Sequence, residues 1–136
     1  MLRVICCIPR CPCLAPGRRG LLCAEHMAMV YEQDRQILGA LWKDFRKTRR
    51  RDAYLLWHGH AAACIAQVLV SIWEGVFTIP LPAHYCHIYG PRCGCGLPSP
   101  CPCPICIEAR AVAEHLPSRR RYYNPQVIHG AARAAG

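Results

Sequence analysis

A chain of 136 residues has room for one modest core, which excludes a large multidomain protein, and its 12 cysteines indicate that crosslinks supplement that core. The formal net charge of +9 favours an acidic partner, such as nucleic acid, an anionic membrane surface or an acidic protein. Residues 1–16 contain no apolar segment typical of a secretory signal, so we expect a reducing compartment, where thiols bind metal in preference to forming disulfides.

Proline and cysteine divide the chain into a cysteine-rich head, a helical middle and a cysteine- and proline-rich tail. No proline occurs between Pro16 and Pro80, so long helices are expected there. The predicted fold is mainly α, a small zinc-stabilised protein with two or three helices between irregular metal-binding ends. Its predicted modules are a zinc-binding head at 1–26, a helical middle at 27–82, a second zinc-binding module at 83–118 and a basic, disordered tail at 119–136.

The head contains a candidate zinc site with the spacing C-x3-C-x11-C-x2-H. Its predicted ligands are Cys7, Cys11, Cys23 and His26. This spacing is typical of structural zinc, and the start of a helix at Cys23 favours thiolate over thiol. Cys6 and Cys13 are alternatives for the first two ligands.

The run from Cys11 to Cys23 contains P-G-R-R at residues 16–19. It resembles the short zinc fingers that read Cys, eleven residues with P-G-R-R, and Cys. Those fingers begin with C-x2-C and end in a cysteine, whereas this chain has a three-residue entry gap and ends in His26. The resemblance implies metal binding and does not name a role.

An apolar stripe at three- and four-residue intervals predicts one helix from Ala24 to Arg51, ending in a basic run. A second helix is predicted from about Asp52 to Trp73. Its apolar segment, 61–72, is shorter than the roughly 20 residues of a membrane span, so a buried helix is favoured. Residues 76–81 are expected to form a short strand or extended exit, and a short helix is expected from Ile105 to about His115.

The second candidate site lies in the proline-rich tail module, where short gaps between cysteines favour convergence on an ion. Its predicted ligands are Cys86, Cys93, Cys101, Cys103 and Cys106. The alternates are His84, His87, Cys95 and His115. These donors suffice for two ions, so the predicted cofactor is Zn²⁺, with two or more ions in the chain.

Residues 86–106 resemble the first cysteine cluster of polyomavirus small t antigens, which reads C-x5-C-x7-C-x-C-x2-C before a basic segment. The last four cysteines match in spacing, and Arg119–Arg121 provide the basic segment. The His-Pro-Asp signature and the second cysteine cluster of that family are absent from the sequence. In that family the cluster is structural and helps to dock a cellular phosphatase, so the resemblance implies a viral accessory protein.

Residues 103–110 read C-P-I-C-I-E-A-R. They resemble the C-x2-C-x-E-x-R ending of the cysteine-rich family that includes plant cadmium-resistance proteins. Because those proteins associate with membranes, this resemblance implies a membrane-associated protein as an alternative.

Two dense basic clusters are candidates for binding a partner. They are Arg49, Arg50 and Arg51, and Arg119, Arg120 and Arg121. They can contact phosphates or serve as a nuclear-import signal, and the alternative is a solvated surface.

His60 and Cys64 share a helix face, but no acid close in the sequence orients the histidine, so a structural role is favoured. With three or four thiolates for each ion, the metal sites are expected to be closed. We therefore expect no catalytic residues and no enzyme activity.

The sequence thus predicts a zinc-binding regulatory protein of the viral accessory type, located in the nucleus and cytoplasm. Its expected partner is a host regulatory protein or nucleic acid, bound through the basic surfaces, and membrane association is not expected. The alternatives are a membrane-associated cysteine-rich protein and a secreted disulfide-rich protein. The identity of the partner and the oligomeric state stay open.

Overall fold

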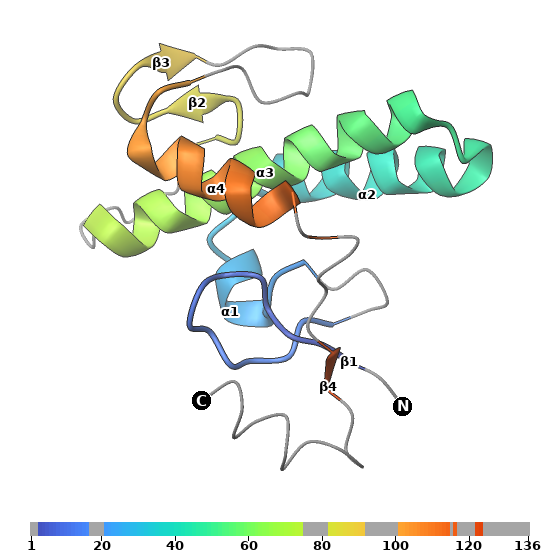
Figure 1. Cartoon of the computed structure of the whole chain (residues 1–136), viewed down its shortest axis with the longest axis horizontal. Helices are drawn as coiled ribbons and strands as arrows, with labels where there is room; N and C mark the ends of the chain where they lie inside the picture. Colours follow the sequence, from blue (N-terminus) through green and yellow to red (C-terminus); the bar gives the residue numbers. More distant parts are fainter. Residues whose placement is uncertain are drawn as a thin grey trace.

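The computed structural model describes residues 3–16, 21–74, 82–91, 101–114, 116 and 122–123. Its helices are α1 (Ala24–Met27), α2 (Glu32–Thr48), α3 (Arg51–Glu74) and α4 (Pro104–Glu114). Two antiparallel ladders pair β1 (Arg3–Val4) with β4 (Tyr122–Tyr123) and β2 (Tyr85–Cys86) with β3 (Gly90–Pro91). The fold is mainly helical, as predicted (Figure 1). Groups of cysteine and histidine that can hold metal lie at both ends.

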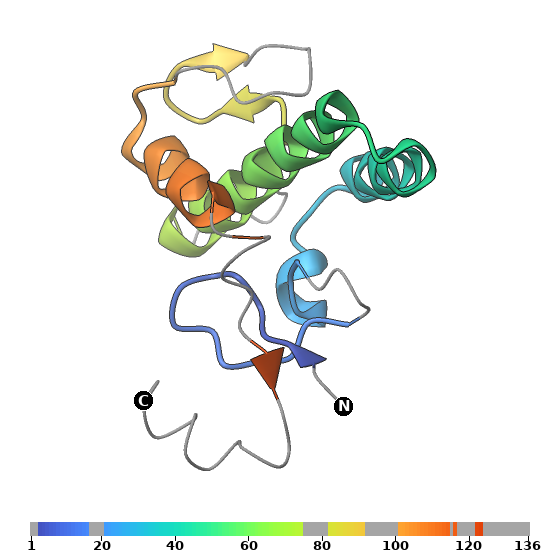
Figure 2. The same cartoon turned by 45° about the vertical axis from the view of Figure 1, so that its right-hand side comes forward.

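The central element is α3, which packs against α2 along one side and against α4 along another (Figures 1 and 2). The head, residues 3–16 and α1, lies below this helical layer, and the β2–β3 hairpin lies above it (Figure 1). Because α3 has neighbours on several sides, it is apolar around most of its circumference. Trp57, Ile65 and Val68 are almost completely buried in the core that it forms.

By length and composition, one helix among the described residues could cross a membrane: residues Arg51–Trp73 of α3, with a mean hydropathy of 1.5 over 18 residues. The fold buries 61% of that window. Packing against α2 and α4 therefore accounts for most of the apolar surface of this helix, in agreement with the buried helix predicted from the sequence.

The helix predicted from Ala24 to Arg51 is in fact two helices, so the prediction of one continuous helix is wrong. α1 ends at Met27, and α2 begins after Tyr31, whose ψ of 142° is extended. The carbonyl of Met27 accepts a hydrogen bond of 3.2 Å from the guanidinium of Arg35. The turn between the two helices lets α1 face the head while α2 packs on α3.

The other predicted boundaries agree closely with the structure, since α3 and α4 begin and end within about a residue of the expected positions. The predicted exit at 76–81 and His115 lie outside the described residues. Tyr122–Tyr123, within the tail that the sequence predicts to be disordered, form β4. The remainder of 119–136 lies outside the described residues.

A buried polar link connects α2 and α3 to the segment that enters β2. Oδ2 of Asp34 accepts the N–H of Ala83 at 3.0 Å, and Oδ1 lies 3.4 Å from Nε2 of His60, a polar contact outside good hydrogen-bond geometry. Burial raises the pKa of Asp34, but the contact with His60 and the bond from Ala83 outweigh it and hold the pKa below its usual 3.8. The carboxylate thus fixes three segments in one place.

Candidate metal centres

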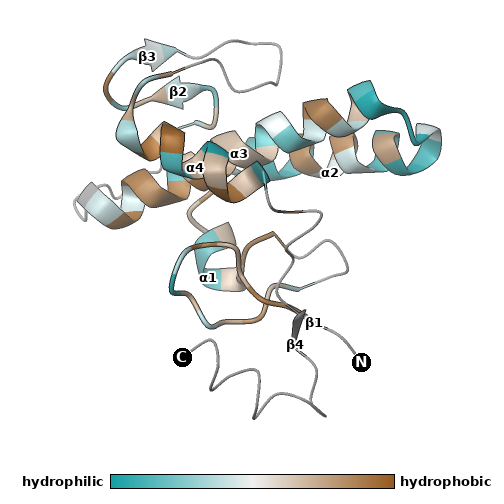
Figure 3. Cartoon of the chain, viewed as in Figure 1, coloured by the Kyte–Doolittle hydropathy of each residue, from teal (hydrophilic) through white to brown (hydrophobic). Residues whose placement is uncertain are grey.

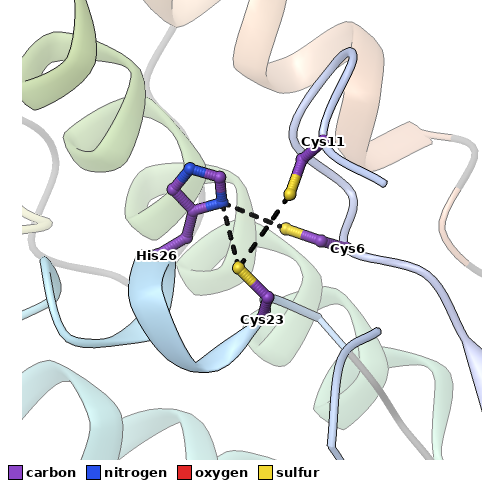
Figure 4. Close-up of side chains that lie close together, drawn as sticks. All are labelled: Cys6, Cys11, Cys23 and His26. Atoms are coloured by element: carbon purple, nitrogen blue, oxygen red, sulfur yellow. Dashed lines mark hydrogen bonds between the residues drawn. The ribbon is translucent and has the colours of Figure 1, made fainter. Parts of the chain in front are cut away.

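Four donors of the head lie close together. We call them the head cluster: Cys6, Cys11, Cys23 and His26 (Figure 4). Nδ1 of His26 lies 3.3 Å from Sγ of Cys6 and 3.3 Å from Sγ of Cys23, and the sulfurs of Cys11 and Cys23 are 4.0 Å apart. Around a tetrahedral zinc ion, two sulfurs are about 3.8 Å apart and a sulfur and a nitrogen about 3.6 Å. The four donors therefore need to move only slightly to bind one ion.

Extended backbone selects the first ligand of this cluster. The N–H of Cys6 donates to the carbonyl of Cys13 at 2.8 Å, and Ile5 forms a β-bridge with Leu14. Side chains alternate in such a segment. Val4, Cys6 and Ile8 are accordingly buried.

The head site predicted with Cys7 is therefore corrected to C-x4-C-x11-C-x2-H, with Cys6 in its place. The register of the bridge turns the side chain of Cys7 to the other face, where it packs half-buried against the edge of the core. Cys13, the other alternate, is exposed and does not belong to the cluster. Residues 4–8 read V-I-C-C-I, so both faces of this segment are apolar and the sequence pattern does not distinguish Cys6 from Cys7.

α1 supplies the second half of the head cluster, as the sequence predicts. Cys23 is the N-cap residue, with an extended ψ of 169°, and its carbonyl accepts the N–H of Met27 at 2.8 Å. A spacing of three residues on one helical turn places its sulfur beside the imidazole of His26. Leu22, almost completely buried, anchors this turn in the core.

The thiols of the head cluster differ in acidity. Burial raises the pKa of Cys6 to about 12, even though the N–H groups of Cys23 and Ile8 oppose it. Burial alone would also raise the pKa of Cys11, but the N–H of Cys13 and the neighbouring thiols outweigh burial and lower this pKa. At neutral pH Cys6 is therefore a thiolate only when a cation replaces its proton.

A second cluster joins the β2–β3 hairpin to the segment that begins α4. We call it the C-terminal cluster: Cys86, His87, Cys101, Cys103 and Cys106. The sulfur of Cys86 lies 3.6 Å from that of Cys101 and 4.0 Å from that of Cys106. Sγ of Cys103 is 3.9 Å from Nδ1 of His87. These distances are again close to the edges of a zinc tetrahedron.

The tight hairpin stabilises a thiolate at Cys86. Burial raises the pKa of this thiol, but the N–H groups of Tyr89 and Ile88, with the thiols of Cys101 and Cys106, lower it to about 7. Gly90 has a φ of +81°, which a residue with a side chain rarely adopts, and this allows the chain to turn back into β3.

α4 holds the other side of the C-terminal cluster against the core. The N–H of Ile107 donates to the carbonyl of Cys103 at 2.9 Å, so this cysteine closes the first turn. The guanidinium of Arg110 donates to the carbonyl of Cys101 at 2.8 Å. At the far end of α4, Nε2 of His58 lies 2.7 Å from the carbonyl oxygen of Ala113, which links α4 to α3.

Most of the predicted ligands of the second site meet in the structure. The structure brings together Cys86, Cys101, Cys103 and Cys106, with the alternate His87. His84 is exposed and belongs to neither group. Cys93, Cys95 and His115 lie outside the described residues.

None of the ten described cysteines forms a disulfide bond. Even the sulfurs of Cys86 and Cys101 are 3.6 Å apart, far longer than the roughly 2.05 Å of a disulfide bond. The sulfurs therefore approach one another as ligands of a shared ion do.

His60 and Cys64, considered above as a catalytic pair, lie inside the fold. Asp34, which is distant in the sequence and was not anticipated, contacts His60 at 3.4 Å. Cys64 is 0% exposed, so a substrate cannot reach its sulfur. This placement favours a structural role for the pair.

The basic residues Arg49, Arg50 and Arg51 are exposed at the turn between α2 and α3. Arg119–Arg121 lie outside the described residues. Comparison of the chain with protein-family models, with curated proteins and with solved structures gave no match.

Proposed function

We propose that the chain is a zinc-binding regulatory protein that binds nucleic acid through the turn between α2 and α3. Zinc is supported by donor sets of thiols with one imidazole in each cluster, which soft divalent ions prefer, and by spacings close to tetrahedral edges. The residues of the two clusters would hold at least two ions. Each ion would add a crosslink between segments that are otherwise joined by very short strands or bridges.

The observation that carries the nucleic-acid proposal is a concentration of exposed positive charge, which we call the basic turn (residues 43–52). It contains six Lys and Arg against two Asp, so it accounts for +4 of the net charge of +9. Figure 3 shows this end of the helical hairpin as hydrophilic. Among the described residues, Arg50 and Asp52 form its one ion pair, at 3.1 Å, which leaves most of its charge available to phosphates.

Two structural features suit the basic turn to phosphate groups. Arg49 ends α2 in the left-handed conformation, with a φ of 56°, and its guanidinium lies 5.7 Å from the centre of the Phe45 ring, which restrains it. α3 begins at Arg51, and the positive end of its dipole favours an anion there.

The test compares binding of mixed-sequence duplex DNA and single-stranded RNA by the native protein and by a triple variant, Arg46→Gln, Lys47→Gln and Arg51→Gln. If about four phosphates are contacted, affinity falls roughly 100-fold between 50 and 200 mM salt, and the triple variant reduces both the affinity and this salt dependence. Equal binding by the variant would contradict the proposal.

A charge-matched control separates the basic turn from net charge. Adding Glu25→Gln, Glu108→Gln and Glu114→Gln to the triple variant restores the net charge of the chain with exposed residues outside the turn. Binding should stay weak. If it recovers, overall charge and not the basic turn is responsible.

Docking on a protein is a second candidate, because large apolar side chains are exposed beside the C-terminal cluster. Each is at least 40% exposed: Tyr85, Ile88, Tyr89 and Ile107. Exposed aromatic and large aliphatic side chains are typical of interface centres. This candidate predicts that Ile88→Ser with Tyr89→Ser abolishes binding of a protein partner, whereas the basic-turn variant retains it.

Location in the nucleus and cytoplasm, a viral origin and a contribution of Arg119–Arg121 to the binding surface remain predictions from the sequence.

A further inference from the structure

The donors of the C-terminal cluster fall into two sets that share one sulfur. Cys86, His87 and Cys103 form one set, and Cys86, Cys101 and Cys106 form the other, with the donor atoms of each set within 4.8 Å of one another. The five described donors do not form a single set within that distance. One tetrahedral ion, whose ligand atoms are all about 3.6–3.8 Å apart, therefore cannot serve both sets in this arrangement.

Cys86 has the position and the chemistry to belong to both sets. Its sulfur faces Cys101 at 3.6 Å and Cys106 at 4.0 Å, while the second set contains the pair of Cys103 and His87, which are 3.9 Å apart. A thiolate sulfur has three lone pairs and can bind two cations at once. An imidazole nitrogen has one lone pair and binds a single cation.

Charge balance favours two ions over one. All four cysteines of this cluster are buried, so an uncompensated charge on them is costly. One Zn²⁺ with four thiolates leaves a net charge of −2, of which Arg110, bound to the Cys101 carbonyl, would offset one unit. Two Zn²⁺ with the same four thiolates give a neutral group.

We propose that the C-terminal cluster binds two zinc ions bridged by the thiolate of Cys86. Cys86, Cys101 and Cys106 are ligands of one ion, Cys86, His87 and Cys103 are ligands of the other, and each tetrahedral ion has room for a fourth ligand beyond these. This inference rests on the zinc binding proposed above and deepens it, because it assigns the number of ions and the shared ligand.

Native mass spectrometry and ¹¹³Cd NMR of the intact chain test the inference. Three zinc ions per chain are expected, one for each group of donors. After replacement by ¹¹³Cd, two of the three signals should show spin–spin coupling to each other, because that coupling passes through a shared sulfur. Three ions without this coupling would overturn the bridge.

The ion count separates failure of this inference from failure of the proposed function. Two ions, one in each cluster, would overturn the bridge and leave zinc binding intact. No bound ion would overturn both.

Matched variants locate the bridge. Cys86→Ser should reduce the count from three ions to one, whereas Cys101→Ser, which alters a ligand of one ion, should remove at most one. An equal loss in the two variants would contradict the assignment of Cys86. Because Cys86→Ser can also unfold the hairpin, the NMR coupling in the native chain remains the deciding measurement.

Discussion

The two candidate metal clusters are built on different backbones. In the head cluster, four donors surround one point, and the paired extended segments and α1 bring them there from three places in the first 26 residues. In the C-terminal cluster, the donors spread over two sets around Cys86, which a tight hairpin holds. The first arrangement suits one ion in a closed four-ligand site, and the second suits two ions that share the sulfur of Cys86.

The clusters also differ in how a thiolate is stabilised before metal binds. Burial raises the pKa of Cys6 to about 12, whereas backbone N–H groups oppose burial at Cys86 and lower its pKa to about 7. The head therefore depends on the cation to ionise its buried thiol. The hairpin provides part of that stabilisation through its own geometry.

The largest expected effect comes from removing zinc altogether. Structural zinc contributes an apparent 10–16 kcal/mol in zinc-finger peptides, about as much as the whole net stability of a small domain. Chelation should therefore unfold residues 3–16 and 82–91, while the α2–α3 pair, which has an apolar core, retains more helix. Far-UV circular dichroism and limited proteolysis with mapped cleavage sites measure this. Unchanged spectra and cleavage would contradict metal binding.

The next largest effect should distinguish Cys6, a proposed ligand, from Cys7 beside it in the sequence. Cys6→Ser should remove the head ion and destabilise the fold by more than about 4 kcal/mol, because losing a metal is one of the few causes of so large a change. Cys7→Ser, the matched control, should keep the full number of ions, since Cys7 is not one of the four donors of the head cluster. Native mass spectrometry and urea unfolding of both variants are the measurements. The reverse result would restore the ligand set predicted from sequence.

Features that depend on spacing within one element can be predicted from the sequence, and features that depend on pairing between segments cannot. The bounds of α3 and α4 and the Cys23–His26 pair follow from spacing along one element, so the sequence predicts them. The choice of Cys6 depends on the bridge between Ile5 and Leu14, and a one-residue change of register would present Cys7 instead. Spacing alone contains no information on that register.

The break after α1 and the Asp34 link were missed for related reasons. Val30 and Tyr31 continue the apolar stripe through the turn, so periodicity suggests one helix where there are two. Asp34 meets Ala83 across 49 positions of the chain, a distance at which neither periodicity nor spacing gives a signal. Both features are fixed by tertiary packing.

A smaller effect is expected from Asp34→Asn, which tests whether the C-terminal cluster depends on the helices. Asparagine keeps one oxygen that can accept the Ala83 N–H but lacks the negative charge that strengthens this bond and the contact with His60. The variant should therefore lose roughly 1–3 kcal/mol and part of the hydrogen-exchange protection at the Ala83 amide. The head should be unaffected. Asp44→Asn, on the exposed face of the same helix, is the control and should change stability by less than about 0.5 kcal/mol.

The stability difference between the native chain and Asp34→Asn should depend on pH in a definite direction. Because the fold holds the pKa of Asp34 below 3.8, its carboxylate contributes full stability above that pH. The contribution is lost as the pH falls from 3.8 through the lower pKa of the folded state. The gap between the native chain and Asp34→Asn, measured by urea unfolding, should therefore shrink in acid. A gap that widens there would show that the carboxylate is not stabilised by its partners.

The most subtle difference is the order in which the clusters lose metal on acidification. Metal binding displaces the proton of each thiol below its pKa, so at pH 7 an ion in the head competes with a tightly held proton on Cys6, while Cys86 is about half ionised already. The Cys6 contribution to affinity should rise with pH from 7 to 9, and that of Cys86 should level off. On acidification the head cluster should release its ion first. ¹¹³Cd NMR, with the head signal assigned by Cys6→Ser, follows both clusters in one sample, and earlier loss from the C-terminal cluster would show that burial of Cys6 does not control affinity.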